Sequence, residues 1–335
     1  MAERRVGTVS SWQPLSPILA LFRLMPEEGH PFPEYRPGQY IALRREDCWL
    51  TRRNVDGQGR ARYAPDLDEQ GRQKRGAVTH SYSISSAPCE TKDQGWLEFY
   101  IVLEKGDAEY PGRLTESLFR IRPGHDDKVS YVDHIVGDFT LEKRAAGFKN
   151  VLMVGTGTGL APFASMLKQL DAEARDGQRS DARYTLIHAN RVYQELAYHR
   201  ALCEIEEGRR LDFVYVPSVS RPVAGEWGSR VGIGRANNLL RHLFGLPSRE
   251  EEELKLAEQS GGDVALARAA VSRAIKAVLP GHVPREGLLE RLPSAETVIL
   301  TCGNPSSMAD IRVVAEAVGI HFEKEDWKAV LPARP

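Results

Sequence analysis

Three closely spaced glycines follow a short apolar run at residues 151–163, which read VLMVGTGTGLAPF. The run at 151–154 is typical of a buried parallel strand, and Pro162 suits the first turn of a helix, where its missing N–H costs nothing. A glycine turn between a strand and a helix presents backbone N–H groups and the positive end of the helix dipole. The pattern predicts a pyrophosphate site. An ordinary glycine-rich turn is the alternative, because Leu160 stands where the strict dinucleotide fingerprint has its third glycine.

A second stretch of the same kind runs from Pro111 through Gly112, Arg113 and Leu114 to Thr115 and opens a short helical segment at 116–119. A helix start that carries a glycine is an anion site for the same physical reasons. Two phosphate sites in separate parts of the chain favour two different nucleotides. Thr115 also has a simpler explanation as a helix N-cap.

Other candidate residues stand at the ends of apolar strands. The strand at 184–188 runs into HANR at 188–191, the strand at 211–216 into PSVSR at 217–221, and the strand at 297–301, taken as the last one, into CGNP at 302–305. Open α/β sheets bind ligands at the carboxyl ends of their strands. An unpaired cysteine in such a place is more often a small buried hydrophobe, but the Gly-Asn-Pro that follows Cys302 favours a functional role.

Two kinds of scaffold must position these residues. Up to about residue 140, short runs such as 40–43, 82–85 and 96–103 are separated by Gly and Pro turns, which indicates an antiparallel β-barrel or sandwich. Beyond it, strands alternate with helical stretches, which indicates a parallel, Rossmann-like α/β sheet. We expect a β-barrel domain at 1–143 with a long loop or hairpin at 44–79, and an α/β domain at 149–335 with a helical insert at about 247–292.

Composition narrows the class of protein. The chain has 335 residues and a net charge of −1, so charge gives no reason to expect nucleic acid or an anionic membrane as a partner. We find no apolar run long enough for a membrane helix and no apolar core of a secretion signal. The four cysteines are scattered, which argues against a metal site, an iron–sulfur cluster or a disulfide scaffold and makes a reducing cytoplasm the simplest compartment.

The order of six short motifs resembles the ferredoxin–NADP reductase family, in particular its bacterial flavodoxin/ferredoxin–NADP reductases. The motifs are R-P-G-Q-Y at 36–40, Y-S at 82–83, G-x-L-T at 112–115, G-T-G-T-G-x-A-P-F at 155–163, S-R at 220–221 and C-G-N-P at 302–305. Each is weak alone, but their shared order covers nearly the whole chain outside the two inserts. The resemblance implies an FAD-binding β-barrel followed by an NADP-binding α/β domain.

The resemblance also implies which residues bind FAD. It assigns His80, Ser81, Tyr82, Ser83, Tyr100, Ile101, Val102, Gly112, Arg113, Leu114, Thr115, Thr158 and Trp327 to this cofactor. Tyr82 would lie against the flavin ring and Ser83 near flavin N5, although a lone tyrosine on a strand usually packs. His80 replaces the arginine that usually clamps the pyrophosphate, so FAD binds more weakly, or Arg113, Lys74 or Arg75 supplies the charge. Trp327 is the candidate flavin lid, with Phe322 as second choice, or a surface anchor for the tail.

A second set of residues would bind NADP(H). It comprises Thr156, Gly157, Thr158, Gly159, Arg191, Ser220, Arg221, Arg230, Cys302, Gly303, Asn304, Pro305 and Met308. Ser220, Arg221 and Arg230 would hold the adenosine 2′-phosphate, a dianion that favours NADP over NAD, unless the arginines are merely exposed loop residues. Cys302 would pack beside the nicotinamide, and with Tyr82 and Ser83 it forms the expected catalytic group.

The activity that follows is FAD-dependent electron transfer between NADP(H) and a one-electron carrier, ferredoxin or flavodoxin, by hydride transfer to flavin N5. Arginines in 44–62 and near Arg36 could face an acidic ferredoxin. One alternative is the reductase component of an oxygenase chain. Another is a non-catalytic, redox-sensing flavoprotein subunit that binds a partner through the helices at 247–292.

Overall fold

The structure is a computed structural model, and it describes residues 3–55, 57, 61–104, 113–223, 225 and 228–325. These residues divide into two compact units, the first ending at Thr140 and the second running from Leu141 to Glu325. None of the helices in the described part of the chain has the length and apolar character that crossing a bilayer requires.

The first unit is built on a six-stranded antiparallel sheet in the order β6-β3-β8-β1-β2-β7. Its elements are β1 (Arg4–Ser16), β2 (Leu19–Met25), β3 (Tyr40–Trp49), β4 (Thr51–Val55), β5 (Ala61–Pro65), β6 (Arg75–Ser83), α1 (Pro88–Gln94), β7 (Leu97–Val102), α2 (Arg113–Leu118) and β8 (Lys128–Val132). Just past β6, Ser85 N donates to Glu98 O of β7 at 2.9 Å, so the two end strands approach each other and the sheet curls into a half-barrel. The predicted antiparallel β architecture is confirmed.

Most of the segment at 44–79 is strand rather than loop. β3 continues to Trp49 and β6 already begins at Arg75, while β4 and β5 pair as a separate two-stranded ribbon between them. The sequence hides these strands because β4 is exposed on both faces and β5 is at most half-buried, so no alternation of apolar and polar residues marks them. The hairpin alternative describes this segment better than a long loop does.

The second unit is a parallel six-stranded sheet in the order β12-β11-β10-β9-β13-β14. Its elements are α3 (Leu141–Arg144), β9 (Asn150–Thr156), η1 (Gly157–Leu160), α4 (Ala161–Arg175), β10 (Arg183–Asn190), η2 (Tyr193–Glu195), α5 (His199–Gly208), β11 (Asp212–Val219), β12 (Gly232–Ile233), α6 (Ala236–Leu243), α7 (Arg249–Ser260), α8 (Val264–Arg273), α9 (Arg285–Arg291), η3 (Ser294–Glu296), β13 (Thr297–Cys302), α10 (Pro305–Val318) and β14 (His321–Lys324). The predicted parallel α/β architecture is confirmed. β13 is not the last strand, however, because β14 pairs with it along the edge.

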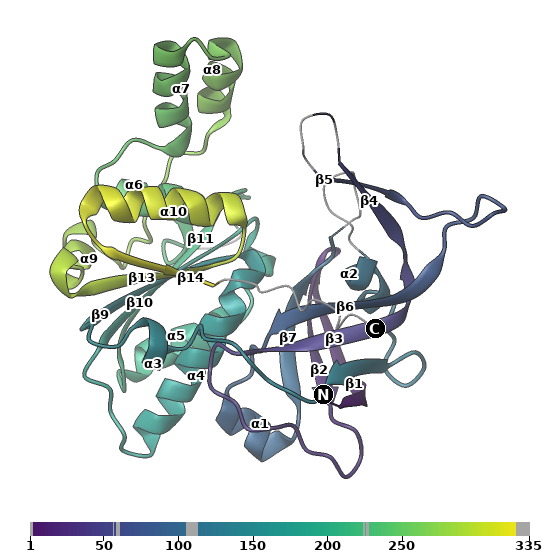
Figure 1. Cartoon of the computed structure of the whole chain (residues 1–335). Coiled ribbons are helices and arrows are strands. Elements are labelled where there is room, and N and C mark those ends of the chain that lie inside the picture. Colours follow the sequence, from purple (N-terminus) through teal and green to yellow (C-terminus); the bar gives the residue numbers. More distant parts are fainter. Residues whose placement is uncertain are drawn as a thin grey trace. The chain divides into compact units, whose positions relative to one another are not determined.

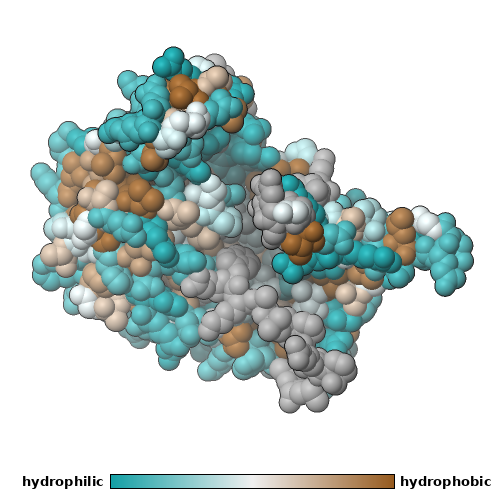
Figure 2. All heavy atoms as spheres, turned by 45° about the horizontal axis from the view of Figure 1, so that its top comes forward, coloured by the Kyte–Doolittle hydropathy of each residue, from teal (hydrophilic) through white to brown (hydrophobic). Residues whose placement is uncertain are grey.

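Helices cover both faces of this parallel sheet. α4 and α5 pack together on one face, and α6 and α10 pack together on the other (Figure 1). The central strands β9, β10 and β13 are buried almost throughout, as a sheet covered on both faces requires. The residues at 247–292 form α7, α8 and α9, of which α7 and α8 make a hairpin that projects from the sheet layers of this unit. Apolar side chains, Leu256 and Leu266 among them, are exposed between charged ones on this hairpin (Figure 2).

Candidate functional site

The glycine turn leaves the carboxyl end of β9 and enters α4 through the short helix η1. Gly157 has a φ of 56°, and a Cβ at this position would meet none of the described residues within 4 Å. Neither Thr156 nor Leu160, the residues that precede η1 and α4, caps the helix with its side chain. The backbone of the turn at 156–159 thus lies beside open space at the N-terminal, positive end of α4 and carries no side-chain cap, a setting that suits a pyrophosphate.

The same turn is tightly packed on its other side. A Cβ on Gly159 would lie 2.1 Å from the carbonyl oxygen of Cys302, and a Cβ on Gly303 would lie 2.2 Å from Oγ1 of Thr156. Asn304 N donates to that Thr156 hydroxyl at 3.0 Å. We call this contact between 156–159 and 302–304 the interlock. It arises because β9 and β13 are neighbours whose ends coincide, with Cys302 opposite Gly155.

Cys302 ends β13 as a fully buried thiol. Its Sγ donates to Oε2 of Glu325 at 2.7 Å, and Glu325 N donates to Thr301 O at 3.0 Å. Burial, followed by the negative charge of Glu325, raises the pKa of the Cys302 thiol well above its usual range. The thiol is therefore protonated at neutral pH and acts as a small polar group rather than as a nucleophile. Sequence reasoning missed Glu325, whose only signal was that 321–325 could form one more parallel strand.

The rest of the CGNP motif begins α10. Asn304 caps this helix, since its Oδ1 accepts from Ser306 N at 3.0 Å and from Ser307 N at 3.2 Å. Pro305 takes the first helical position, where a proline is tolerated, and Met308 is buried. The Asn304 side chain is thus committed to the helix, which leaves backbone groups and Cys302 as the parts of this motif that a ligand can contact.

Two further strand ends lie side by side at the same edge of the sheet. Arg221 N donates to Arg191 O at 2.7 Å and Ser220 N to Asn190 O at 2.9 Å, which joins the segments that follow β10 and β11. The Arg221 side chain is exposed and has no ion-pair partner among the described residues. An exposed guanidinium beside a serine hydroxyl at this edge suits a phosphate dianion.

The other two arginines expected to bind NADP(H) are already paired. Arg191 forms a two-pronged ion pair with the buried Glu195, and Arg230, the second arginine expected at the 2′-phosphate, lies 2.9 Å from Glu207 of α5. Each carboxylate offsets the positive charge of its arginine. Of the three arginines expected to bind NADP(H), Arg221 is thus the one without a carboxylate partner in the described part of the chain. Neither carboxylate lies within a motif, so the motifs alone do not reveal these ion pairs.

In the β unit, β6 and α2 pack against each other, and each carries a buried polar atom without a hydrogen-bond partner among the described residues. The two atoms are Oγ of Ser81 and Nε of Arg113. Such unpartnered donors cost free energy unless a ligand or water satisfies them, so the region around β6 and α2 fits a polar group such as the FAD pyrophosphate. Gly112, the neighbouring expected ligand, lies outside the described residues, as does Trp327.

The charge at this place comes from Arg113 rather than from His80. His80 reaches solvent, yet the protein around it partly desolvates its ring, and this desolvation together with the charge of Arg113 lowers the pKa of the imidazole. The ring is therefore mostly neutral at neutral pH. Lys74 is held 3.4 Å from Asp66 and the Arg75 guanidinium lies 4.1 Å from the centre of the Trp49 ring, so both of these alternatives are engaged elsewhere.

Helix α2 is fixed by contacts that the sequence did not reveal. Ser117 donates to Asp47 and accepts from Arg45 Nε at 2.9 Å, and Arg120 donates to Asp47 at 2.7 Å. Thr115 is no N-cap, because it lies inside the helix and its Oγ1 accepts from Glu104 N at 3.1 Å. The Leu114 side chain is buried in the barrel core, so only its backbone is open to a ligand.

The remaining expected flavin residues lie on β6 and β7. Ser83 is buried, while Tyr82 is half-buried against the barrel core, and burial raises the pKa of its hydroxyl. Tyr100 and Ile101 point into the protein from β7, which stands at the end of the sheet order. At that edge the backbone of 100–102, rather than the buried side chains, is suited to contact a ligand.

A half-barrel precedes a parallel sheet that carries a glycine turn at its carboxyl edge, an arrangement suited to binding dinucleotides. The oxidoreductase NAD-binding domain family matches residues 153–252. This part of the chain is therefore an oxidoreductase NAD-binding domain, and the chain is similar to ferredoxin–NADP reductases beyond it.

Individual relatives are similar to this chain at low sequence identity. A flavodoxin/ferredoxin–NADP reductase of Buchnera aphidicola subsp. Baizongia pistaciae is 32% identical over 137 residues, which are 40% of this chain and 48% of that protein. A ferredoxin–NADP reductase of Azotobacter vinelandii is 28% identical over 177 residues, 51% of this chain and 62% of that protein. Both matches thus span less than two thirds of the curated relative. A solved ferredoxin NADP+ reductase from Neisseria gonorrhoeae, with bound FAD and NADP, superposes with a TM-score of 0.58 at 18% identity, covering 97% of this chain and 99% of that one.

Proposed function

We propose that this protein is an FAD-dependent reductase that transfers electrons between NADP(H) and a one-electron carrier protein, ferredoxin or flavodoxin. The observation that carries the proposal is the interlock, which fixes the open phosphate-binding turn at 156–159 against the Cys302 motif. A dinucleotide whose pyrophosphate sits on this turn has its nicotinamide end held within reach of Cys302. The two named reductase relatives act on ferredoxin or flavodoxin.

Several residues would hold the cofactor and pose the substrate. FAD, when bound, supplies a group that takes two electrons as a hydride and releases them singly. Arg113 and Ser81 would hold its pyrophosphate, and Tyr82 and Ser83 would contact its ring. The protonated Cys302 thiol, kept in place by Glu325, would contact the nicotinamide without giving up its proton. The protein thereby contributes orientation and exclusion of water, which are the terms that matter for a hydride transfer.

Arg221 favours NADP(H) over NAD(H). It is exposed at the carboxyl edge, and no carboxylate among the described residues offsets its charge. Arg221→Ala should therefore lower kcat/KM for NADPH by about 10- to 100-fold, as loss of a charge-assisted contact to phosphate does, and leave kcat/KM for NADH nearly unchanged. Arg200→Ala is the matched control, because Arg200 is an exposed arginine of the same unit paired with Glu204. Equal losses with both coenzymes would contradict this assignment.

The carrier would meet basic residues of the first unit, although fewer than the sequence suggests. Arg45 is buried and its guanidinium donates to Asp126 through Nη1 and Nη2, at 3.1 and 2.8 Å, so the expectation that it faces a carrier is wrong. Arg44 is paired with Glu46. Arg53 on β4 is exposed and has no ion-pair partner among the described residues, so it is the arginine we assign to an acidic carrier.

An anaerobic titration of the purified protein with NADPH, with and without ferredoxin or flavodoxin, tests the whole proposal. We expect a flavin spectrum that NADPH bleaches and that the oxidised carrier restores. Arg53→Glu should slow carrier reduction but not dye reduction. A flavin that NADPH does not bleach would refute the enzyme and favour a non-catalytic subunit. Bleaching without electron transfer to either carrier would refute the assigned partner and favour an oxygenase chain.

A further inference from the structure

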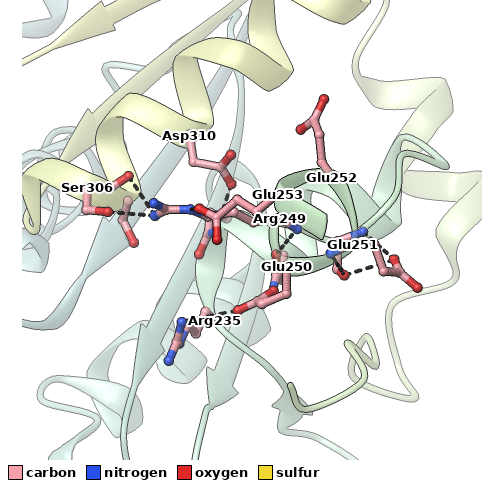
Figure 3. A network of polar contacts seen from close by, with 12 residues as sticks. Arg235, Arg249, Glu250, Glu251, Glu252, Glu253, Ser306 and Asp310 are labelled. Carbon is pink, nitrogen blue, oxygen red and sulfur yellow. Dashed lines mark hydrogen bonds and ion pairs between the residues drawn. The ribbon is translucent and has the colours of Figure 1, made fainter. Parts of the chain in front are cut away.

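The inserted helix α7 is attached to the start of α10. Nη1 of Arg249, the first residue of α7, donates to Oγ of Ser306 at 2.6 Å and lies 3.4 Å from the Ser306 carbonyl oxygen (Figure 3). Nε of the same guanidinium donates at 2.7 Å to Glu253, which lies one turn further along α7, and this second contact orients the guanidinium. The guanidinium therefore bridges the insert and the second residue of α10.

A second attachment lies one helical turn further along α10. Arg241 of α6 is buried and contacts Glu252 of α7 and Asp310 of α10, each at 2.5 Å. Asn237 adds a hydrogen bond to Asp310 at 2.8 Å. Since Ser306 and Asp310 are four residues apart, they lie on one face of α10, which the insert reaches directly at Ser306 and through Arg241 of α6 at Asp310.

The first turn of α7 is itself fixed to α6. Arg249 N donates to Oδ1 of Asn238 at 3.0 Å, and Glu250 accepts from Nδ2 of Asn238 at 2.8 Å. Ser248 caps the helix, and its side chain and that of Glu251 satisfy each other's backbone N–H. The end of α7 that faces α10 is thus rigidly built, although the rest of the α7–α8 hairpin contributes no buried residue.

The contact of Arg249 with Ser306 continues to the interlock through Asn304. Ser306, which Arg249 holds, donates its N–H to Asn304, and Asn304 in turn donates to Thr156 within the interlock. We propose that Arg249 is a positioning residue, through which the inserted helix α7 holds the turn at 302–306 in the geometry that the nicotinamide end of NADP(H) requires. The ligand of this inference, NADP(H), rests on the proposed function, whereas the attachment of α7 to the turn at 302–306 does not.

The test compares Arg249→Ala, Ser306→Ala and the double variant in the full-length, FAD-loaded protein. Arg268→Ala is the matched control, because Arg268 pairs with Glu258 at 3.0 Å within the same hairpin and does not contact α10. Hydrogen exchange at 303–308 should be several-fold faster in Arg249→Ala, and KM for NADPH should rise by about fivefold with little change in kcat, as loss of one hydrogen bond predicts. Arg268→Ala should match wild type in both measurements.

The double variant shows whether Arg249 acts through Ser306. We expect it to be no worse than Arg249→Ala alone, and Arg249→Lys to restore part of the effect because an ammonium can still reach one oxygen. Wild-type exchange rates at 303–308 in Arg249→Ala would overturn the inference whatever the coenzyme does. So would additive losses in the double variant. Faster exchange in a protein that NADPH fails to bleach would uphold the attachment and refute the proposed function instead.

Discussion

Replacing Gly159 by alanine tests the interlock most directly. The added Cβ would lie 2.1 Å from Cys302 O, 2.3 Å from Cys302 C and 2.5 Å from Gly303 N, all of them backbone atoms that cannot rotate away. Ordinary contact begins at about 3.4 Å, so the glycine turn must move away from 302–303 by more than about 1 Å. Gly159 does not have a positive φ, so the effect is steric and not a matter of backbone conformation.

The size of the effect follows from this displacement. Overpacking of this kind typically costs about 1–3 kcal/mol of unfolding free energy. A shift of about 1 Å between the phosphate-binding turn and the Cys302 motif should lower the rate of NADPH-dependent flavin reduction by about 100-fold. FAD content should stay at the wild-type level, because the described residues assigned to FAD, apart from Thr158, belong to the first unit.

Stopped-flow absorbance of the flavin after mixing with NADPH measures this rate, and the ratio of flavin to protein absorbance measures FAD content. Gly177→Ala is the control: its φ of 87° strains an alanine, but a Cβ there meets nothing within 4 Å among the described residues. That variant should lose about 1 kcal/mol of stability and keep its reduction rate. A Gly159→Ala protein that reduces its flavin within threefold of the wild-type rate would refute the role of the interlock.

Three further predictions concern titratable groups. Burial is the largest cause of the raised pKa of Cys302, and the charge of Glu325 is the second. Glu325→Gln removes that charge, so the pH profile of Cys302 alkylation should move to lower pH while the profile of Cys203 stays in place. A shift shared by both cysteines, or no shift, would contradict the pairing of Cys302 with Glu325. Burial lowers the pKa of His188 to about 3, so below about pH 6.5 the unfolded chain binds a proton that the native state does not. The free energy of unfolding should therefore fall by about 1.4 kcal/mol per pH unit from pH 6.5 toward 3. Urea unfolding at pH 7.5 and 5.5 measures this loss. The loss should be smaller in His188→Asn than in the wild type, whereas the exposed-histidine control His30→Gln should lose as much as the wild type. Partial burial raises the pKa of Asp47, but hydrogen bonds from Ser117 and Arg120 outweigh it and lower the pKa to about 2. The stabilisation from this carboxylate is therefore present above about pH 4 and is lost as the pH falls toward 2. Asp47→Asn should loosen α2 and weaken FAD retention at pH 7, measured by flavin release on gel filtration, whereas Asp66→Asn, next to the β4–β5 ribbon, should not.

The features that sequence alone predicted are those encoded by neighbouring residues. The turn at 155–159 and the Cys302 motif each carry their own local signal, since glycines, a helix-starting proline and an apolar strand stand together. Order along the chain then sufficed to place both at the carboxyl edge of one parallel sheet, where the structure has them.

The features that sequence missed depend on partners far away in the chain. Glu325 reaches Cys302 only because β14 pairs with β13 in the register that sets Lys324 beside Thr301. The sequence around Arg45 suggests an exposed loop residue, but in the fold its side chain contacts Asp126, Asp47 and Ser117. Charge counting on a segment cannot distinguish an arginine free to meet a partner from one already neutralised within the fold.

The strand order of the second unit has a consequence for how the chain folds. β9, β10 and β11 follow one another closely, but β13 must enter the sheet beside β9 by pairing residues that are 147 positions apart in the chain. Until β13 has left the ribosome, β9 is an apolar strand with one open edge, the kind of surface that recruits other chains. Closing so long a loop is slow, so the interlock forms last. A chain truncated before β13 keeps the glycine turn but leaves this edge of β9 open, which makes it a substrate for chaperones.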